Sequence, residues 1–178
     1  MQLISRTAQS IIDSKALRVS MGVLLIFLAA QVQIPLNPVP ITLHTSAVLL
    51  IALCYKRSEA LQAIIGYITI GSLGAPVFAE YTSGFSILFG CSGGYLFGMV
   101  LCTYLVTTLR KKFGEDSWLK LTVYSMIGSI SIYMIGIPYL AFSVGVENSL
   151  EFGLYPFIVP GIVKAIFMAS SVKLLKSK

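Results

Sequence analysis

The stretch VSMGVLLIFLAAQVQIPLNPVPITLHTSAVLLIALCY, residues 19–55, contains no Asp, Glu, Lys or Arg. Four further runs lack charged residues in the same way: 60–79, 81–109, 121–146 and 152–163. The whole chain of 178 residues is 56% hydrophobic and 11% charged, with a mean hydropathy of +0.86. A soluble domain usually carries about 25% charged residues, and a helix needs about 20 apolar residues to cross a bilayer. The composition therefore excludes a soluble or disordered protein and predicts an all-α integral membrane protein.

Prolines and glycines divide these runs into six predicted transmembrane helices that form a single domain. Residues 31–40 contain three prolines, which cannot continue a helix, and residues 71–76 end another run with two glycines and a proline. The predicted spans are 17–33, 42–55, 59–73, 91–109, 118–144 and 160–175. Residues 1–16 mix apolar and charged side chains, which is typical of an amphipathic segment at the membrane surface.

The distribution of charged residues predicts how the six spans are oriented in the membrane. With six spans both termini lie on one side, and every Lys and Arg except Lys164 falls on that side, whereas Glu80, Glu147 and Glu151 fall on the other. The positive-inside rule then predicts cytoplasmic termini in a multi-pass protein of the cell's inner or plasma membrane. The formal net charge of +6 comes from short clusters beside the membrane, which favour contacts with lipid headgroups over binding to nucleic acid.

Lys164 is the one cation predicted to lie inside the membrane, about one turn after the last span begins at Pro160. A lysine in this position is costly and usually marks a functional site. Beside the free N–H groups of a first helical turn, its ammonium group would form a site for an anion. The alternative is that the long side chain only reaches up to the lipid headgroups.

Other polar positions cluster near the same side of the predicted membrane. Glu80 could pair with Lys164, bind N–H groups of a ligand, or simply be solvated. His44 stands alone, so a hydrogen bond at a helix end is favoured over catalysis. Gly93 and Gly94, at the mouth of the fourth span, could expose backbone N–H groups to a ligand or only allow close helix packing.

The sequence offers no catalytic or metal-binding group. Cys54, Cys91 and Cys102 lack metal-ligand spacing, and no Gly-x-x-x-x-Gly-Lys-Ser/Thr motif for ATP is present. We therefore predict that the protein is not an enzyme and holds no cofactor or metal. Its outer loops, its aromatic residues and Lys164 predict a small pocket for an anionic ligand, as in a substrate-binding subunit.

Five stretches make the sequence similar to the BioY family, the biotin-binding S components of energy-coupling-factor (ECF) transporters. The similarity runs from about residue 17 to the C-terminus. The stretches are QVQIPLNPVPITLHT (31–45), GSLGAPVFA (71–79), GCSGGYLFG (90–98), GIPYLA (136–141) and PFIVPGIVKA (156–165).

This resemblance implies a six-helix S component that captures biotin with high affinity from outside the cell. It also implies that a transmembrane coupling subunit and two cytoplasmic ATPases drive uptake, so that ATP hydrolysis belongs to those partners. Lys164 matches the family's binding-site lysine, Thr42 lies on the loop that covers the ligand, and Glu80 falls where family members often have Asn. Gly93, Gly94, Tyr95, Tyr139 and Gly161 are the further candidate substrate-binding residues, and both tyrosines belong to the aromatic residues on the outer side.

The sequence departs from the family pattern at the start of the last helix. The family's usual Pro-Gly-Asp-x-x-Lys places Gly161 at the Asp position, so an acceptor for the ureido N–H groups of biotin is lost. We hypothesise that Glu80 supplies a carboxylate in its place. Two alternatives stay open: an S component for another small anionic vitamin, and a structural or assembly membrane protein.

Overall fold

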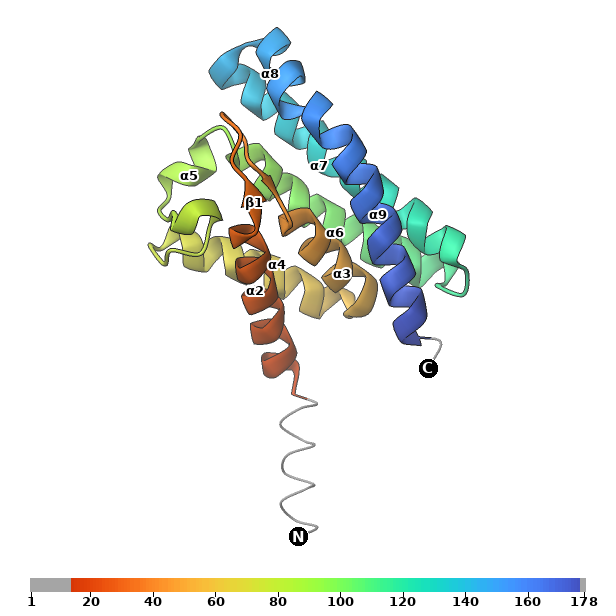
Figure 1. Cartoon of the computed structure of the whole chain (residues 1–178). Helices are drawn as coiled ribbons and strands as arrows, with labels where there is room; N and C mark the ends of the chain where they lie inside the picture. The colour runs from red at the N-terminus through yellow and green to blue at the C-terminus, as the bar shows by residue number, and fades with distance from the viewer. Residues whose placement is uncertain (1–13, 177–178) are drawn as a thin grey trace.

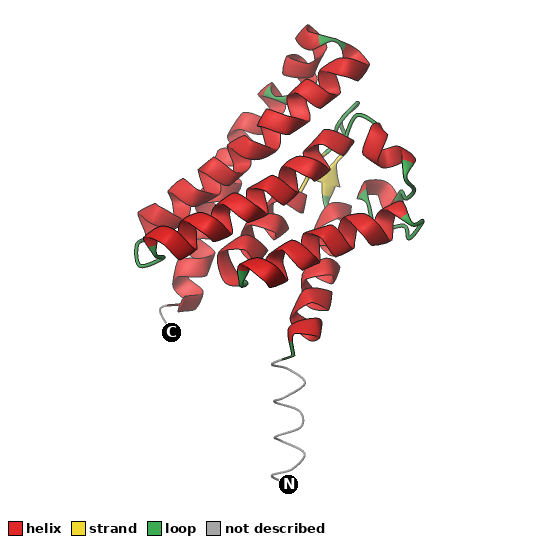
Figure 2. Ribbon diagram, turned by 180° about the vertical axis from the view of Figure 1, so that it is seen from behind, coloured by secondary structure: helices red, strands yellow, loops and turns green. Residues whose placement is uncertain are grey.

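The computed structural model describes residues 14–176, which are almost entirely helical (Figures 1 and 2). Six of the described helices overlap the predicted spans: α2 (Lys15–Gln31), α3 (His44–Cys54), α4 (Arg57–Ser72), α6 (Gly93–Phe113), α7 (Trp118–Val144) and α9 (Tyr155–Lys176). The shorter elements are strands β1 (Gln33–Ile34) and β2 (Ile41–Thr42), the 3-10 turn η1 (Ala79–Tyr81), α5 (Ser86–Phe89) and α8 (Val146–Gly153). Residues 1–13 of the predicted amphipathic segment lie outside the described residues.

The proline-rich segment forms a hairpin between α2 and α3. Strands β1 and β2 pair antiparallel, with Gln33 opposite Thr42 and Ile34 opposite Ile41. Because proline lacks an N–H group, the connecting residues cannot extend either helix. Helix α3, which follows the hairpin, has 11 mostly buried residues, which gives a length of about 16 Å.

Glycines set the distance between α6 and α7, which pack along most of their length. A Cβ atom added at Gly98 would lie 2.7 Å from both the Cα and the carbonyl oxygen of Ile132. The backbones of the two helices therefore meet directly, as expected for small residues at helix contacts in membranes. This contact fixes where the cavity-facing residues of both helices lie.

The beginning of the last helix was predicted wrongly. Helix α9 starts at Tyr155 rather than Pro160, and the residues before it form α8 instead of an open loop. A proline is well tolerated in the first turn of a helix, and Pro156 takes that place, so Pro160 lies inside the helix. Lys164 consequently lies more than two turns from the helix start, and its ammonium group is not at the free N–H groups of a first turn.

The described part of the chain contains two helical segments that are long and apolar enough to cross a membrane by length and composition, Trp118–Val144 and Val146–Lys176. The remaining main helices are shorter or, like α6, end in a basic turn. The start of α2 and the end of α9 lie at the same end of the molecule, opposite α8 (Figure 1).

Candidate functional site

A cavity of about 460 Å³ lies between the hairpin, the loop that contains η1, and the helices α3, α6, α7 and α9. This volume is within the range of pockets for small organic ligands. The hairpin loop from Pro35 to Pro40 covers one side, and side chains from α6, α7 and α9 form the inner wall. Each part of the site thus comes from a different region of the sequence.

Lys164 lines this cavity and is held in place by the hairpin. Its ammonium nitrogen donates a hydrogen bond of 2.7 Å to the backbone carbonyl of Thr42, and the Thr42 hydroxyl accepts one of 3.2 Å from the backbone N–H of His44. An ammonium group has three donors, so two of them stay available to a ligand. Lys164 and Thr42 thus meet at this cavity, and their role in binding stays a prediction.

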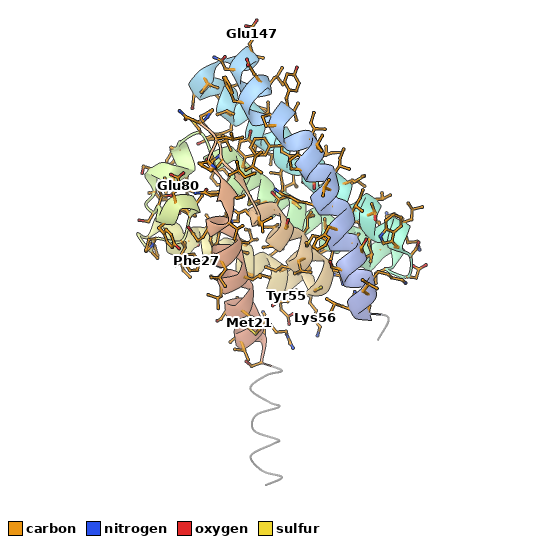
Figure 3. The ribbon with its side chains drawn as sticks, in the orientation of Figure 1. Met21, Phe27, Tyr55, Lys56, Glu80 and Glu147 are labelled. Carbon is orange, nitrogen blue, oxygen red and sulfur yellow. The ribbon has the colours of Figure 1, made fainter. Side chains whose placement is uncertain are left out.

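Glu80, labelled in Figure 3, also lines this cavity and lies on a loop with unusual backbone geometry. Glu80 and Tyr81 both adopt left-handed conformations, with φ of 59° and 55°. Such residues persist only where their surroundings hold them. Both residues line the cavity, and no ion pair joins Glu80 to Lys164 within residues 14–176.

Gln31 is the residue that holds this loop, and the sequence reasoning had not given it a role. Its amide nitrogen donates to the carbonyl of Phe78 at 2.9 Å and to that of Val77 at 3.3 Å, and its amide oxygen accepts from the Tyr81 N–H at 3.2 Å. Gln31 is the last residue of α2, directly before the hairpin. The feature of the sequence that could have identified Gln31 is an uncharged polar residue near the end of an apolar span, at the start of the first stretch that matches the family.

His44 is a cavity residue that was also not among the predicted site residues. Its side chain is 5% exposed and lines the cavity, with the ring edge-on to Tyr67 at a centroid distance of 5.0 Å. The backbone N–H of His44 donates to the Thr42 hydroxyl at the start of α3. The side-chain Nε2 is buried without a hydrogen-bond partner in the described part of the chain, so the predicted side-chain bond at the helix end stays a prediction. A buried polar atom of this kind is uncommon and needs a partner such as water or a ligand.

An aromatic wall forms the apolar part of the cavity. Tyr95 stacks on Phe157 at a centroid distance of 6.3 Å and contacts Tyr133 edge-on at 6.5 Å. The Tyr95 hydroxyl donates a hydrogen bond of 2.9 Å to the carbonyl of Gly153, which fixes the ring against α8. Tyr95 was a candidate site residue, whereas Tyr133 was not, since an isolated tyrosine in a long apolar run carries no distinctive pattern.

The remaining predicted site residues pack behind the cavity and do not line it. A Cβ atom on Gly93 would lie 1.9 Å from the Leu88 carbonyl oxygen, and one on Gly94 would lie 2.3 Å from Cβ of Tyr139. The Tyr139 hydroxyl donates to that same Leu88 carbonyl at 2.8 Å. These contacts support the packing alternative for both glycines, because a ligand cannot occupy space already filled by protein.

Gly161 lies one layer behind the cavity, next to Tyr133. A Cβ atom at Gly161 would stand 3.1 Å from the Tyr133 hydroxyl, which itself makes a long hydrogen bond of 3.4 Å to the Phe157 carbonyl. The space in front of Gly161 is therefore filled by this tyrosine. The position that would hold the family's aspartate is occupied by a hydroxyl group from α7.

The groups that line the cavity are the ammonium group of Lys164, the carboxylate of Glu80 and the imidazole of His44, whose Nε2 has no partner among the described residues, together with the aromatic wall. Within residues 14–176, no three His, Cys, Asp or Glu side chains lie close enough together to hold a metal ion. The arrangement suits a small ligand with one anionic end, one end rich in N–H groups and an apolar middle.

Comparison with known proteins identifies a family that matches this chain. The model of the BioY family matches residues 5–178. The probable biotin transporter BioY of Rickettsia prowazekii is 34% identical over 164 residues, covering 90% of this chain and 84% of that protein. The corresponding protein of Pyrococcus horikoshii is 35% identical over 147 residues, covering 83% of this chain and 86% of that protein.

A solved structure shares the fold. The S-component for biotin from an ECF-type ABC transporter superposes with a TM-score of 0.79 at 21% sequence identity, covering 98% of this chain and 94% of that one. The chain therefore has an S-component fold.

Proposed function

Since this chain belongs to the BioY family, we propose that it binds biotin and serves as the substrate-binding S component of an ECF-type transporter for biotin uptake. The single observation that carries the proposal is the pair of opposite charges, Lys164 and Glu80, that line one cavity without forming an ion pair. The relatives from Pyrococcus horikoshii and Thermotoga maritima are named as biotin transporters, the former as a probable one, and the solved S-component is one for biotin.

The chemistry of biotin fits the two ends of this cavity. Its valerate carboxylate would take the two free donors of Lys164, in the charge-assisted geometry that Thr42 already fixes. Its ureido N–H groups would donate to Glu80, which stands in for the carboxylate lost at Gly161. The bicyclic ring would lie on the aromatic wall of Tyr95 and Phe157.

The membrane arrangement follows from the same proposal. We take α2, α3, α4, α6, α7 and α9 as six transmembrane helices, with the basic end that holds both termini in the cytoplasm. The cavity then opens to the outside of the inner or plasma membrane. The chain has no ATP-binding motif, so a transmembrane coupling subunit and two cytoplasmic ATPases would supply the energy.

Biotin uptake by whole cells tests the proposal. A strain that lacks biotin synthesis and its own transporter would express this chain together with its coupling subunits, and uptake of labelled biotin would be followed over time. We expect saturable accumulation with the parent chain and little with Lys164→Met. Uptake of another small anionic vitamin in place of biotin would favour the alternative substrate, and no accumulation of either would contradict the transport proposal.

A further inference from the structure

A second hollow, of about 570 Å³, lies at the end of the molecule opposite α8. It is formed by the turn between α3 and α4, the last turns of α6 and the loop that leads to α7. Figure 3 labels Tyr55 and Lys56 at this end and Glu147 at the other. The side chains that matter are Lys56, Arg57, Ser58, Arg110, Lys111 and Glu115. The biotin proposal assigns no role to this hollow.

The hollow carries an excess of positive charge that the protein does not neutralise. Glu115 is the acidic residue that lines it, and both Arg110 and Lys176 already bind this carboxylate, the second at 2.7 Å. In the described chain, Lys56 and Lys111 form no ion pair. Three cations, Lys56, Arg57 and Lys111, are thus left to attract an anion.

Arg57 is fixed in place and still lacks part of its hydrogen bonding. Its guanidinium carbon lies 5.0 Å from the centre of the Tyr104 ring, a cation–π contact that orients the group. Its Nε atom is buried and has no hydrogen-bond partner. Arg57 lines the hollow, and within residues 14–176 no ion pair neutralises its charge.

The backbone adds further donors at the same place. Helix α4 has 16 residues and begins at Arg57, and the residue before it, Lys56, provides no side-chain cap. The N–H groups of a first helical turn lack the usual partner one turn back, and a helix N-terminus attracts negative charge. In α4 the Glu59 N–H already donates to the Lys56 carbonyl at 3.0 Å, and the Glu59 carboxylate is bound by Arg18. The N–H groups of Arg57 and Ser58 are therefore the ones left for a ligand. The Ser58 hydroxyl lines the hollow beside these groups. Backbone, hydroxyl and cationic donors therefore converge, which is the donor set that proteins use for phosphate.

We propose that this hollow binds a phosphate group, carried by the headgroup of an anionic phospholipid or present as free phosphate. A lipid source fits the position, because the hollow lies among the cations that flank the predicted spans and the phosphates of the bilayer lie at that depth. Bound there, a phosphate would join the α3–α4 turn to the end of α6. The site differs from general attraction of lipid by basic residues, because it depends on which lysines line the hollow.

Lipid retention by the purified full-length chain tests this proposal. The protein would be placed in nanodiscs of phosphatidylcholine with a fraction of phosphatidylglycerol, and the bound lipid would be counted by native mass spectrometry. We expect Lys56→Gln and Lys111→Gln each to weaken retention of phosphatidylglycerol about fivefold or more, as for a lost charge-assisted bond. Lys112→Gln is the matched control, since Lys112 is adjacent, removes the same charge and does not line the hollow.

A second arm separates the two sources of phosphate. In nanodiscs of phosphatidylcholine alone, inorganic phosphate at constant ionic strength would be tested for raising the melting temperature of the parent but not of Lys56→Gln. Such a rise identifies free phosphate as a ligand, whereas selective retention of phosphatidylglycerol without it identifies the lipid. Equal losses for Lys111→Gln and Lys112→Gln with no phosphate effect would overturn the proposal. Biotin binding measured on every variant shows that each is folded.

Discussion

Removing the ammonium group of Lys164 should weaken the binding of biotin through its carboxylate alone. In the structure the Lys164 ammonium group donates one hydrogen bond of 2.7 Å to the Thr42 carbonyl. Its other two donors are available to a ligand in the cavity. The substitution Lys164→Met keeps most of the apolar length of the side chain and removes the charge. The change therefore addresses the charge-assisted bond rather than the packing of α9.

The magnitude follows from the bond that is lost. Hydrogen bonds to charged groups contribute about 1.5–3 kcal/mol, and about 1.4 kcal/mol corresponds to a tenfold change in affinity. We therefore expect the dissociation constant for biotin to rise by about 10- to 150-fold. The Thr42 carbonyl loses its partner in the free and in the bound protein alike, so that loss largely cancels in the binding free energy.

Isothermal titration calorimetry with biotin and with biotin amide measures this effect. The parent should bind the acid more tightly than the amide, and Lys164→Met should bind both about equally. Lys173→Met is a matched control, because Lys173 lies on the same helix at the opposite end and donates to the backbone of Asp116. An equal loss of affinity for acid and amide in Lys164→Met would refute a carboxylate-binding role for this lysine.

Three further predictions follow from the same structure. Glu80→Gln should weaken biotin binding about tenfold, since a charged acceptor for the ureido group becomes neutral; unchanged calorimetric affinity would show that Glu80 does not replace the missing aspartate. Burial raises the pKa of Glu115, but hydrogen bonds from its two cationic partners outweigh this and lower the pKa below 4.5. The stability it contributes is present above about pH 4.5 and is lost as the pH falls through the lower folded value, so thermal melts should be more acid-sensitive for the parent than for Glu115→Gln. Gly98→Ala should destabilise the fold by about 1–3 kcal/mol through overpacking against Ile132. Gly90→Ala should not, because its added Cβ atom would meet nothing closer than 3.6 Å. Equal melting temperatures for the two variants would contradict the packing argument.

The sequence predicted the helical elements well where local signals were strong. Uninterrupted apolar runs and three closely spaced prolines located the main helices and the break after the first of them, which was predicted after residue 33 and lies after Gln31. It failed at the last helix, because Pro156 and Pro160 can both stand near a helix start and only the packing of α8 and α9 decides between them. The prediction therefore placed Lys164 too close to the start of the helix. Its assignment to a cavity did not depend on that error.

The site was predictable only in part, because its geometry depends on contacts between distant segments. Lys164 was identifiable as a cation in an apolar span, but its hydrogen bond to Thr42 joins residues from opposite ends of the chain. The roles of Gln31 and His44 rest on which of their polar atoms find partners, which no local pattern encodes. Gly93 and Gly94 show the converse, since their spacing could not distinguish backbone exposed to a ligand from backbone packed against Leu88 and Tyr139.

The central claim is that the cavity between Lys164 and Glu80 is a biotin site that recognises both ends of the ligand. The most direct test is an equilibrium binding titration of the purified chain with biotin and with lipoate, which has a carboxylate but no ureido group. We predict saturable binding of one biotin per chain and at least about tenfold weaker binding of lipoate. Failure to bind biotin, or equal affinity for the two acids, would contradict the account.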